Sequence, residues 1–223
     1  MHEAIGGVLP FAVGVALSPM PIVAMLLMLL TPRARATGTS FLLGWIAGVA
    51  VAGAVVLAVL GSAGASDSGA PATWTGWLKV VLGVALLGLA VREWRRRPGP
   101  AEEPARPPWM AALDSVTPVK AAGLAFVLSA VNPKNLALII GGAAVVAGAD
   151  LPVADQAVTW AVFTVVASIG VATPMAIYLF LGDRAADVLH GLETWMMRSN
   201  TAVMAVLLVV IGVKLIGDGI AIL

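Results

Sequence analysis

The chain has 223 residues, of which 60% are hydrophobic and only 11% are charged, with a formal net charge of +1. A soluble domain carries about 25% charged residues, so this composition excludes a water-soluble fold and indicates a protein built for the bilayer. The sequence contains no cysteine, which excludes disulfides, thiolate metal sites and thiol redox chemistry.

Six apolar stretches are long enough to cross the hydrocarbon core as α-helices, which takes about 17 to 25 residues. The first follows Met1-His2-Glu3, which lacks the basic region of a cleaved signal peptide, so we expect a retained span. The sequence therefore predicts an all-α integral membrane protein with six transmembrane helices, at 4–30, 39–60, 74–91, 118–146, 153–181 and 200–220.

An Arg- and Pro-rich segment, 92–117, separates the third stretch from the fourth. We expect it to be a cytoplasmic linker between a first three-helix repeat, 1–91, and a second one, 118–223. Arginine and lysine also flank the other connections on this side, whereas the loops near 62–73 and 148–152 contain neither. The positive-inside rule then places both termini outside.

Proline interrupts the first and the fourth stretch at a similar depth, in Ser18-Pro19-Met20-Pro21 and Asn132-Pro133-Lys134-Asn135. Proline removes a backbone donor and clashes with the preceding turn, so both helices are expected to be broken near mid-membrane. Because each half has three spans, the halves enter from opposite sides, as in an inverted repeat with a central binding site. The alternative is that these prolines only kink their helices.

Lys134 is the one cation expected near mid-membrane, where an ionisable side chain is a functional hypothesis by default. All twelve Asp and Glu residues fall in terminal, loop or interfacial stretches, so the sequence gives Lys134 no evident counter-ion. The N-terminus of a half-helix also attracts anions. We therefore expect a phosphate, sulfate or carboxylate of the substrate beside Lys134. An alternative role for Asn132 and Asn135 is to satisfy carbonyls freed by the break.

Other chemistries lack their parts in this sequence. The scarcity of carboxylates at depth disfavours transport of hard divalent cations, and His2 and His190 lie at or beyond the membrane edges without a catalytic cluster. We expect no enzyme activity, no cofactor, no bound metal and no nucleic-acid partner. Membrane lipids are the expected partners, and the small interior of six short helices is compatible with a homodimer.

Glycine and tryptophan mark positions of packing and anchoring. Gly44, Gly48 and Gly53 in the second stretch predict close helix packing rather than substrate contact. Six tryptophans mostly lie near span ends and are expected to be interfacial anchors: Trp45, Trp74, Trp77, Trp94, Trp109 and Trp195.

Asn132-Pro133-Lys134 resembles the NPK motif of the lysine-exporter superfamily. Further segments resemble the glycopeptidolipid-addressing (GAP) proteins, also called the sulfolipid-addressing family: 17–22, 28–35, 41–45, 108–110 and 132–136. The resemblance implies a six-helix transporter of the bacterial inner membrane that delivers envelope glycolipids outward. Its motif positions here are Ser18, Pro19, Pro21, Asn132, Pro133, Lys134 and Asn135. Amino-acid exporters of the superfamily show a Pro-Gly-Pro type sequence where this chain has Ser-Pro-Met-Pro, which disfavours amino-acid export.

The leading hypothesis is a transporter or flippase that exports an anionic or glycosylated envelope lipid and holds its head group at the paired helix breaks. One alternative is an exporter of small solutes, such as amino acids or ions. Another is an accessory protein that docks a lipid synthase through the Arg-rich linker.

Overall fold

The computed structural model describes residues 1–31, 33–63, 73–95 and 116–223, and every regular element in them is helical. A 3-10 turn, Gly182–Arg184, precedes the last helix. The α-helices are α1 (His2–Ala16), α2 (Pro19–Leu29), α3 (Ala34–Ala63), α4 (Thr73–Arg95), α5 (Pro118–Ala130), α6 (Pro133–Ala147), α7 (Val153–Phe180) and α8 (Ala185–Ile220).

Both predicted helix breaks are confirmed. The chain bends by 51° between α1 and α2 and by 60° between α5 and α6. Ser18 and Asn132 adopt extended backbone conformations at these bends, with ψ of 115° and 120°, because a residue before proline is disfavoured in the helical region. Pro19 and Pro133 then begin the next helix, at the position where a missing N–H costs no helical hydrogen bond.

Among the described residues, α3 and α7 are each long and apolar enough to cross a membrane. Each bent pair provides one further span if its two helices are counted together, which gives up to four spans. The predicted third and sixth spans correspond to α4 and α8, and a total of six stays a prediction.

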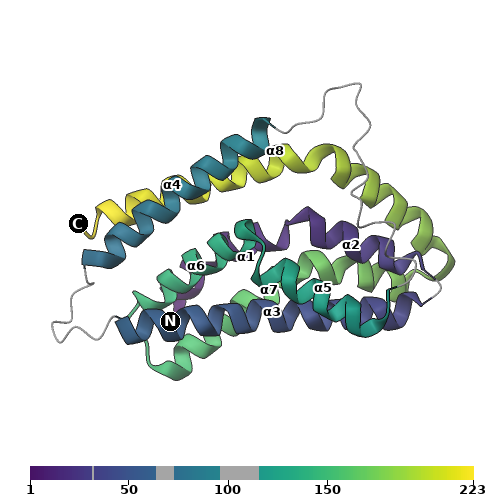
Figure 1. Cartoon of the computed structure of the whole chain (residues 1–223), viewed down its shortest axis with the longest axis horizontal. Coiled ribbons are helices and arrows are strands. Elements are labelled where there is room, and N and C mark those ends of the chain that lie inside the picture. Colours follow the sequence, from purple (N-terminus) through teal and green to yellow (C-terminus); the bar gives the residue numbers. More distant parts are fainter. Residues whose placement is uncertain (32, 64–72, 96–115) are drawn as a thin grey trace.

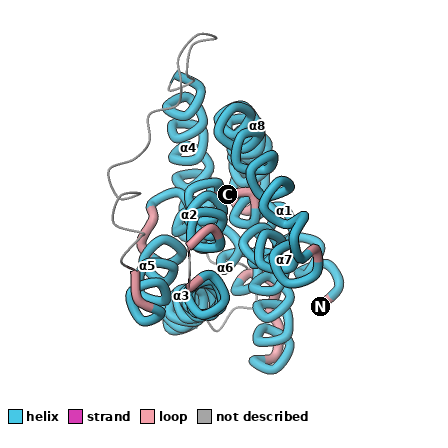
Figure 2. The backbone as a smooth tube through the Cα atoms, turned by 90° about the vertical axis from the view of Figure 1, so that its right-hand side faces the viewer, coloured by secondary structure: helices cyan, strands magenta, loops and turns pink. Residues whose placement is uncertain are grey.

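Figures 1 and 2 show α4 and α8 side by side along one flank of a bundle formed by the other helices. The two helices run antiparallel and approach closely at glycine pairs. A Cβ built on Gly83 would lie 2.6 Å from the carbonyl oxygen of Gly212, and one built on Gly219 would lie 2.7 Å from that of Gly76. Only residues without a side chain permit this spacing, so the glycines set the distance between α4 and α8.

The predicted packing role of the α3 glycines is confirmed. A Cβ on Gly44 would collide with the backbone of Ala122 in α5, and one on Gly48 would collide with the Ser129 hydroxyl. Gly53 makes room for the indole ring of Trp160 in α7. These contacts place α3 directly against α5 at one level and against α7 at another.

The structure corrects three expectations. α4 continues to Arg95 rather than ending at 91, and α8 begins at Ala185 rather than at 200. Trp45 is not an interfacial anchor, because its side chain is fully buried and its Nε1 donates to the Ala167 carbonyl at 3.4 Å. Trp77 and Trp94 are exposed, as expected. The linker residues 96–115 and the side chains of Trp74, Trp109 and Trp195 lie outside the described residues.

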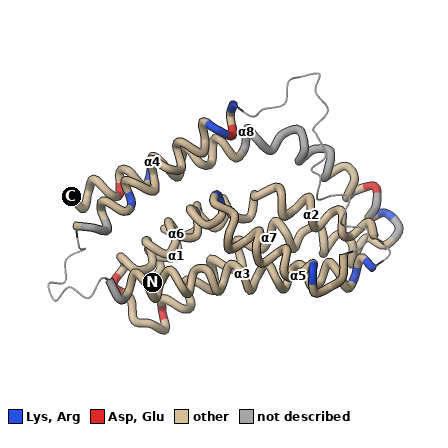
Figure 3. The backbone as a smooth tube through the Cα atoms, viewed as in Figure 1, with Lys and Arg blue, Asp and Glu red and all other residues tan. Residues whose placement is uncertain are grey.

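Figure 3 shows Lys and Arg where α3 and α5 begin, and groups of both signs at the end of α4 and near the C-terminus. Arg33, Arg35 and Lys120 lie at or beside the starts of α3 and α5, Glu3 lies in the first turn of α1, and Asp150 and Asp155 lie at or beside the start of α7.

Candidate functional site

The break between α5 and α6 is built by two asparagines. The Asn132 side-chain oxygen accepts from the backbone N–H of Lys134 at 3.1 Å and so caps α6. Asn135 is fully buried, and its Nδ2 donates across the break to the Leu128 carbonyl at 3.0 Å. This confirms that Asn135 satisfies a carbonyl near the end of α5, whereas Asn132 satisfies an N–H instead. The Oδ1 of Asn135 has no hydrogen-bond partner.

The break between α1 and α2 has a different character. Ser18 is 2% exposed and makes no side-chain capping bond to α2, while Pro19 and Pro21 are buried. Because two of its first three residues are prolines, α2 offers only the N–H of Met20 in those positions. In the same positions α6 has one proline and two N–H groups, of which the Lys134 N–H donates to the Asn132 side chain.

The two broken spans pack against each other rather than lying on separate surfaces. A Cβ built on Gly141 of α6 would lie 2.5 Å from the Phe11 ring of α1, and one on Gly14 of α1 would lie 3.0 Å from the Leu138 side chain. The end of α1 is also enclosed, because Gly170 of α7 presses on the Ala16 carbonyl. The end of α1 and the residues Ser18, Pro19 and Pro21 are therefore buried, whereas Leu17 and Met20 of the same break are exposed.

Lys134 has a counter-ion that the sequence did not reveal. Its Nζ lies 4.0 Å from Oε1 of Glu93 in α4, and the two side chains are 12% and 28% exposed. The earlier expectation failed because Glu93 was assigned to the linker, whereas it belongs to the last turn of α4. The sequence did contain a signal for the helical position of Glu93. Residues 92–95 follow the third apolar stretch without a proline or glycine, so they can continue its helix by one more turn.

The predicted site residues therefore divide by accessibility. Ser18, Pro19, Pro21 and Asn135 are buried, whereas Asn132, Pro133 and Lys134 are at least partly accessible. A ligand could meet the second group directly, and the first group shapes the breaks from within. No cluster of three or more metal-ligating side chains occurs in the described part of the chain.

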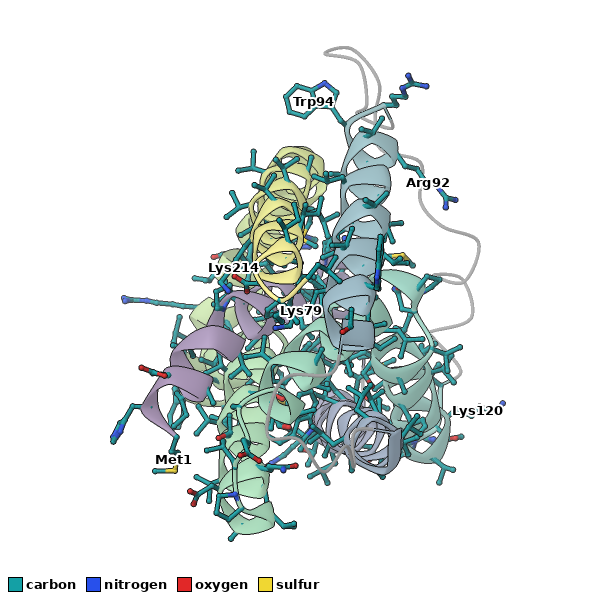
Figure 4. All side chains as sticks on the ribbon, turned by 90° about the vertical axis from the view of Figure 1, so that its left-hand side faces the viewer. Met1, Lys79, Arg92, Trp94, Lys120 and Lys214 are labelled. Carbon is teal, nitrogen blue, oxygen red and sulfur yellow. The ribbon has the colours of Figure 1, made fainter. Side chains whose placement is uncertain are left out.

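Other cations lie away from this break. Lys214 of α8 forms an ion pair with Asp218 at 2.6 Å, and Figure 4 places Lys79 of α4 at the same end of the α4–α8 pair. Lys120 points away from the bundle, as does Arg92. Among these cations, only Lys134 combines substantial burial with a position at a helix break.

Two apolar hollows flank the helices. One, of about 760 Å³, lies between the C-terminal half of α3 and the N-terminal half of α7. A smaller one, of about 370 Å³, lies between α4 and α8 and is bordered by Trp94 and Arg95. Both are lined mainly by aliphatic side chains, so they suit hydrocarbon better than a polar solute.

The comparisons place the chain in a lipid-related family. A family model described as "Sap, sulfolipid-1-addressing protein" matches residues 8–221, nearly the whole chain. Comparisons with curated proteins and with solved structures found no match.

Proposed function

Since the chain belongs to the sulfolipid-1-addressing protein family, we propose that it is a transporter that moves an anionic or glycosylated lipid outward across the bacterial inner membrane. One observation carries the proposal. A partly buried ammonium, that of Lys134, stands at the N-terminus of a half-helix in a break that the other half of the chain repeats.

The proposed architecture is two inverted three-helix repeats forming six spans. Pro133 lies 114 positions after Pro19, and each begins the second helix of a bent pair. In this register Asn132 corresponds to Ser18, and Lys134 corresponds to Met20. The last helices of the two halves, α4 and α8, meet antiparallel at glycines. Both features are expected when repeats are related by an axis in the membrane plane.

The positive charge of Lys134 favours a negatively charged ligand. Its ammonium donates hydrogen bonds only, and the half-helix N-terminus adds partial positive charge beside it. A lipid phosphate or sulfate therefore finds attraction from two sources. The Glu93 carboxylate is the present partner of this ammonium, with Oε1 at 4.0 Å from the Lys134 Nζ. This distance is longer than a direct charge-assisted hydrogen bond of about 2.8 Å. We propose that the substrate anion displaces the Glu93 carboxylate from Lys134 on binding, and that the carboxylate replaces the anion when the substrate is released.

The charge distribution supports the proposed orientation. The arginines and lysines at the starts of α3 and α5 gather at one end of the bundle, which the positive-inside rule assigns to the cytoplasm. The N-terminus lies at the other end, and both termini are then outside. We propose transport without chemical conversion of the substrate, and therefore no catalytic residue and no cofactor.

The decisive experiment is lipid translocation in reconstituted vesicles. Lys134→Ala is compared with Lys120→Ala, which removes an equal charge from an exposed position that points away from the bundle. An anionic fluorescent lipid, phosphatidylglycerol, and a zwitterionic one, phosphatidylcholine, serve as probes. The proposal expects Lys134→Ala to slow the anionic lipid about tenfold or more, as for loss of about 1.4 kcal/mol of binding. Equal rates for the two variants would reject Lys134 as the head-group site.

A further inference from the structure

The larger of the two hollows is an open groove between α3 and α7, the two helices that are each long and apolar enough to cross a membrane. Its lining combines small and aliphatic residues of α3 and α7, among them Ala54, Ala58, Ala157 and Ala161. Two polar side chains of the lining already donate hydrogen bonds within the protein. Gln156 donates to the Leu151 carbonyl at 2.9 Å, and Thr164 donates to the Trp160 carbonyl at 2.9 Å. The rest of the lining is mostly aliphatic, and an acyl chain requires no hydrogen-bond partner.

Trp160 is one of the residues that line this groove. Its indole lies against Gly53 of α3 and stacks on Phe163 with ring centroids 4.3 Å apart. The side chain is 6% exposed, yet its Nε1 has no hydrogen-bond partner. Most buried indole N–H groups are satisfied, so this donor indicates an interaction that the present conformation does not make.

Trp45, the other tryptophan of the α3–α7 interface, suggests which carbonyl could accept a hydrogen bond from the Trp160 Nε1. Trp45 of α3 donates to the Ala167 carbonyl of α7. Trp160 lies 115 positions after Trp45, and Ala167 lies 115 positions after Ala52. This offset is one more than the 114 between Pro19 and Pro133, so aligning the two tryptophans places one additional residue between the proline and the tryptophan of the second half. Exchanging the two repeats therefore turns the Trp45–Ala167 bond into a Trp160–Ala52 bond. Ala52 neighbours Gly53, the residue that the Trp160 indole already touches.

We propose that α3 and α7 form a lateral gate to the lipid phase, and that the groove beside Trp160 receives an acyl chain of a membrane lipid. In the present state the hydrogen bond from Trp45 closes the α3–α7 interface around Trp45. Around Trp160 the same interface is open, and this open part holds the acyl chain of the lipid. When the gate reverses, Trp160 donates to the Ala52 carbonyl, the groove closes and the Trp45 bond is lost. This inference rests on the inverted repeats of the proposed function and assigns them a moving interface.

Photo-crosslinking tests the groove without requiring transport. Vesicles contain the full chain and phosphatidylglycerol with a diazirine in its acyl chain, and labelled peptides are mapped by mass spectrometry. Ala54→Phe and Ala161→Phe together fill the groove, whereas Val55→Phe adds the same bulk at a neighbouring, 57% exposed position that does not line it. We expect saturable labelling of α3 and α7 peptides that the filled variant loses and the Val55 variant keeps. Unsaturable labelling, equal in all variants, would identify ordinary surrounding lipid and overturn the assignment.

The two tryptophans give a second readout with opposite signs. Trp45→Phe removes the bond that holds the present state, so the equilibrium constant should shift away from this state by about fivefold for a hydrogen bond worth about 1 kcal/mol, and groove labelling should fall. Trp160→Phe removes the bond of the other state, so labelling should stay equal or rise. A fall in both variants would mean that the tryptophans only support folding and would overturn the gate.

The outcomes separate this inference from the proposed function. If groove labelling follows the gate while Lys134→Ala translocates normally, the head-group role of Lys134 fails and the gate stands. If Lys134→Ala is impaired while the groove is labelled only as surrounding lipid, the gate fails and the head-group site stands.

Discussion

Replacing Glu93 with Gln tests whether the Lys134–Glu93 pair is an exchangeable contact or a fixed structural one. The substitution keeps the shape of the side chain and removes its charge. If the substrate anion competes with Glu93 for Lys134, the variant binds anionic lipid more tightly than the parent chain does. If the pair only holds α4 against α6, the variant loses stability and gains no affinity.

The magnitude follows from the distance. Unit charges 4 Å apart attract by about 4 kcal/mol at an effective dielectric constant of about 20. Exposures of 12% and 28% leave both groups partly hydrated, and the desolvation that remains offsets much of the attraction. A net contribution of about 1 to 2 kcal/mol is therefore reasonable for this pair. Removing the competing carboxylate should then raise the affinity for the anion by about 5- to 30-fold.

The assay measures binding of phosphatidylglycerol and its translocation in the same vesicles. Glu93→Gln should bind the lipid more tightly and release it more slowly, because the carboxylate that replaces the anion is gone. The exchanged pair, Lys134→Glu with Glu93→Lys, provides the control. The exchanged pair keeps an ion pair between α4 and α6 but moves the ammonium from the α6 N-terminus to α4. Its thermal stability should therefore equal that of the parent chain, whereas its binding of the anionic lipid should be lost.

Two results would refute the reasoning. One is unchanged lipid affinity in Glu93→Gln together with a lower melting temperature, which assigns the pair to structure alone. The other is full translocation by the exchanged pair, which would show that the position of the ammonium at the helix break is irrelevant.

Three further predictions concern stability in detergent, measured by thermal unfolding. Gly53→Ala places a methyl group inside the Trp160 indole and should cost about 1 to 3 kcal/mol by overpacking. Asn135→Leu leaves the Leu128 carbonyl unpaired at the break and should cost about 1 to 3 kcal/mol. Gly83→Ala should separate α4 from α8 and lower the melting temperature, because the added Cβ would lie 2.6 Å from a backbone carbonyl.

Matched glycines on the same helices control for the substitution itself. A Cβ on Gly61 of α3 or Gly88 of α4 meets nothing within 4 Å. Gly61→Ala and Gly88→Ala should leave the melting temperature unchanged or raise it, because alanine favours the helix by up to about 1 kcal/mol. Equal losses at Gly53 and Gly61, or at Gly83 and Gly88, would contradict the packing assigned to α3 and α4. For Asn135, a variant as stable as the parent chain would show that the Leu128 bond contributes nothing.

The helix breaks could be predicted from the sequence because their cause is local. Pro19 and Pro133 each remove a backbone donor and disfavour a continuous helix, and the structure bends there by 51° and 60°, although Pro10 and Pro174 lie inside the continuous helices α1 and α7. The packing role of Gly44 and Gly48 was equally accessible, since small residues four apart favour close helix contact. Both inferences needed only backbone sterics.

The ion pair and the buried tryptophan could not be predicted in the same way. Whether Glu93 lies in a helix depends on how far α4 extends, and three charged residues among 92–95 resemble a loop as much as a last turn. Trp45 was placed near the membrane edge because the second span was expected to begin at 39, whereas α3 begins at Ala34. Its burial depends on α7 packing over it, which no local pattern encodes.

The proposed exchange at Lys134 and the proposed gate share one physical form. A ligand shifts a conformational equilibrium only through interactions that differ between the two states. Lys134 can hold either Glu93 or a substrate anion, and the α3–α7 interface can hold either the Trp45 bond or its Trp160 counterpart. At both places one interaction is replaced by another of similar free energy, so neither conformational state is much more stable than the other. Coupling between the two exchanges would make head-group binding bias the gate, and Glu93→Gln should then change groove labelling as well as lipid affinity.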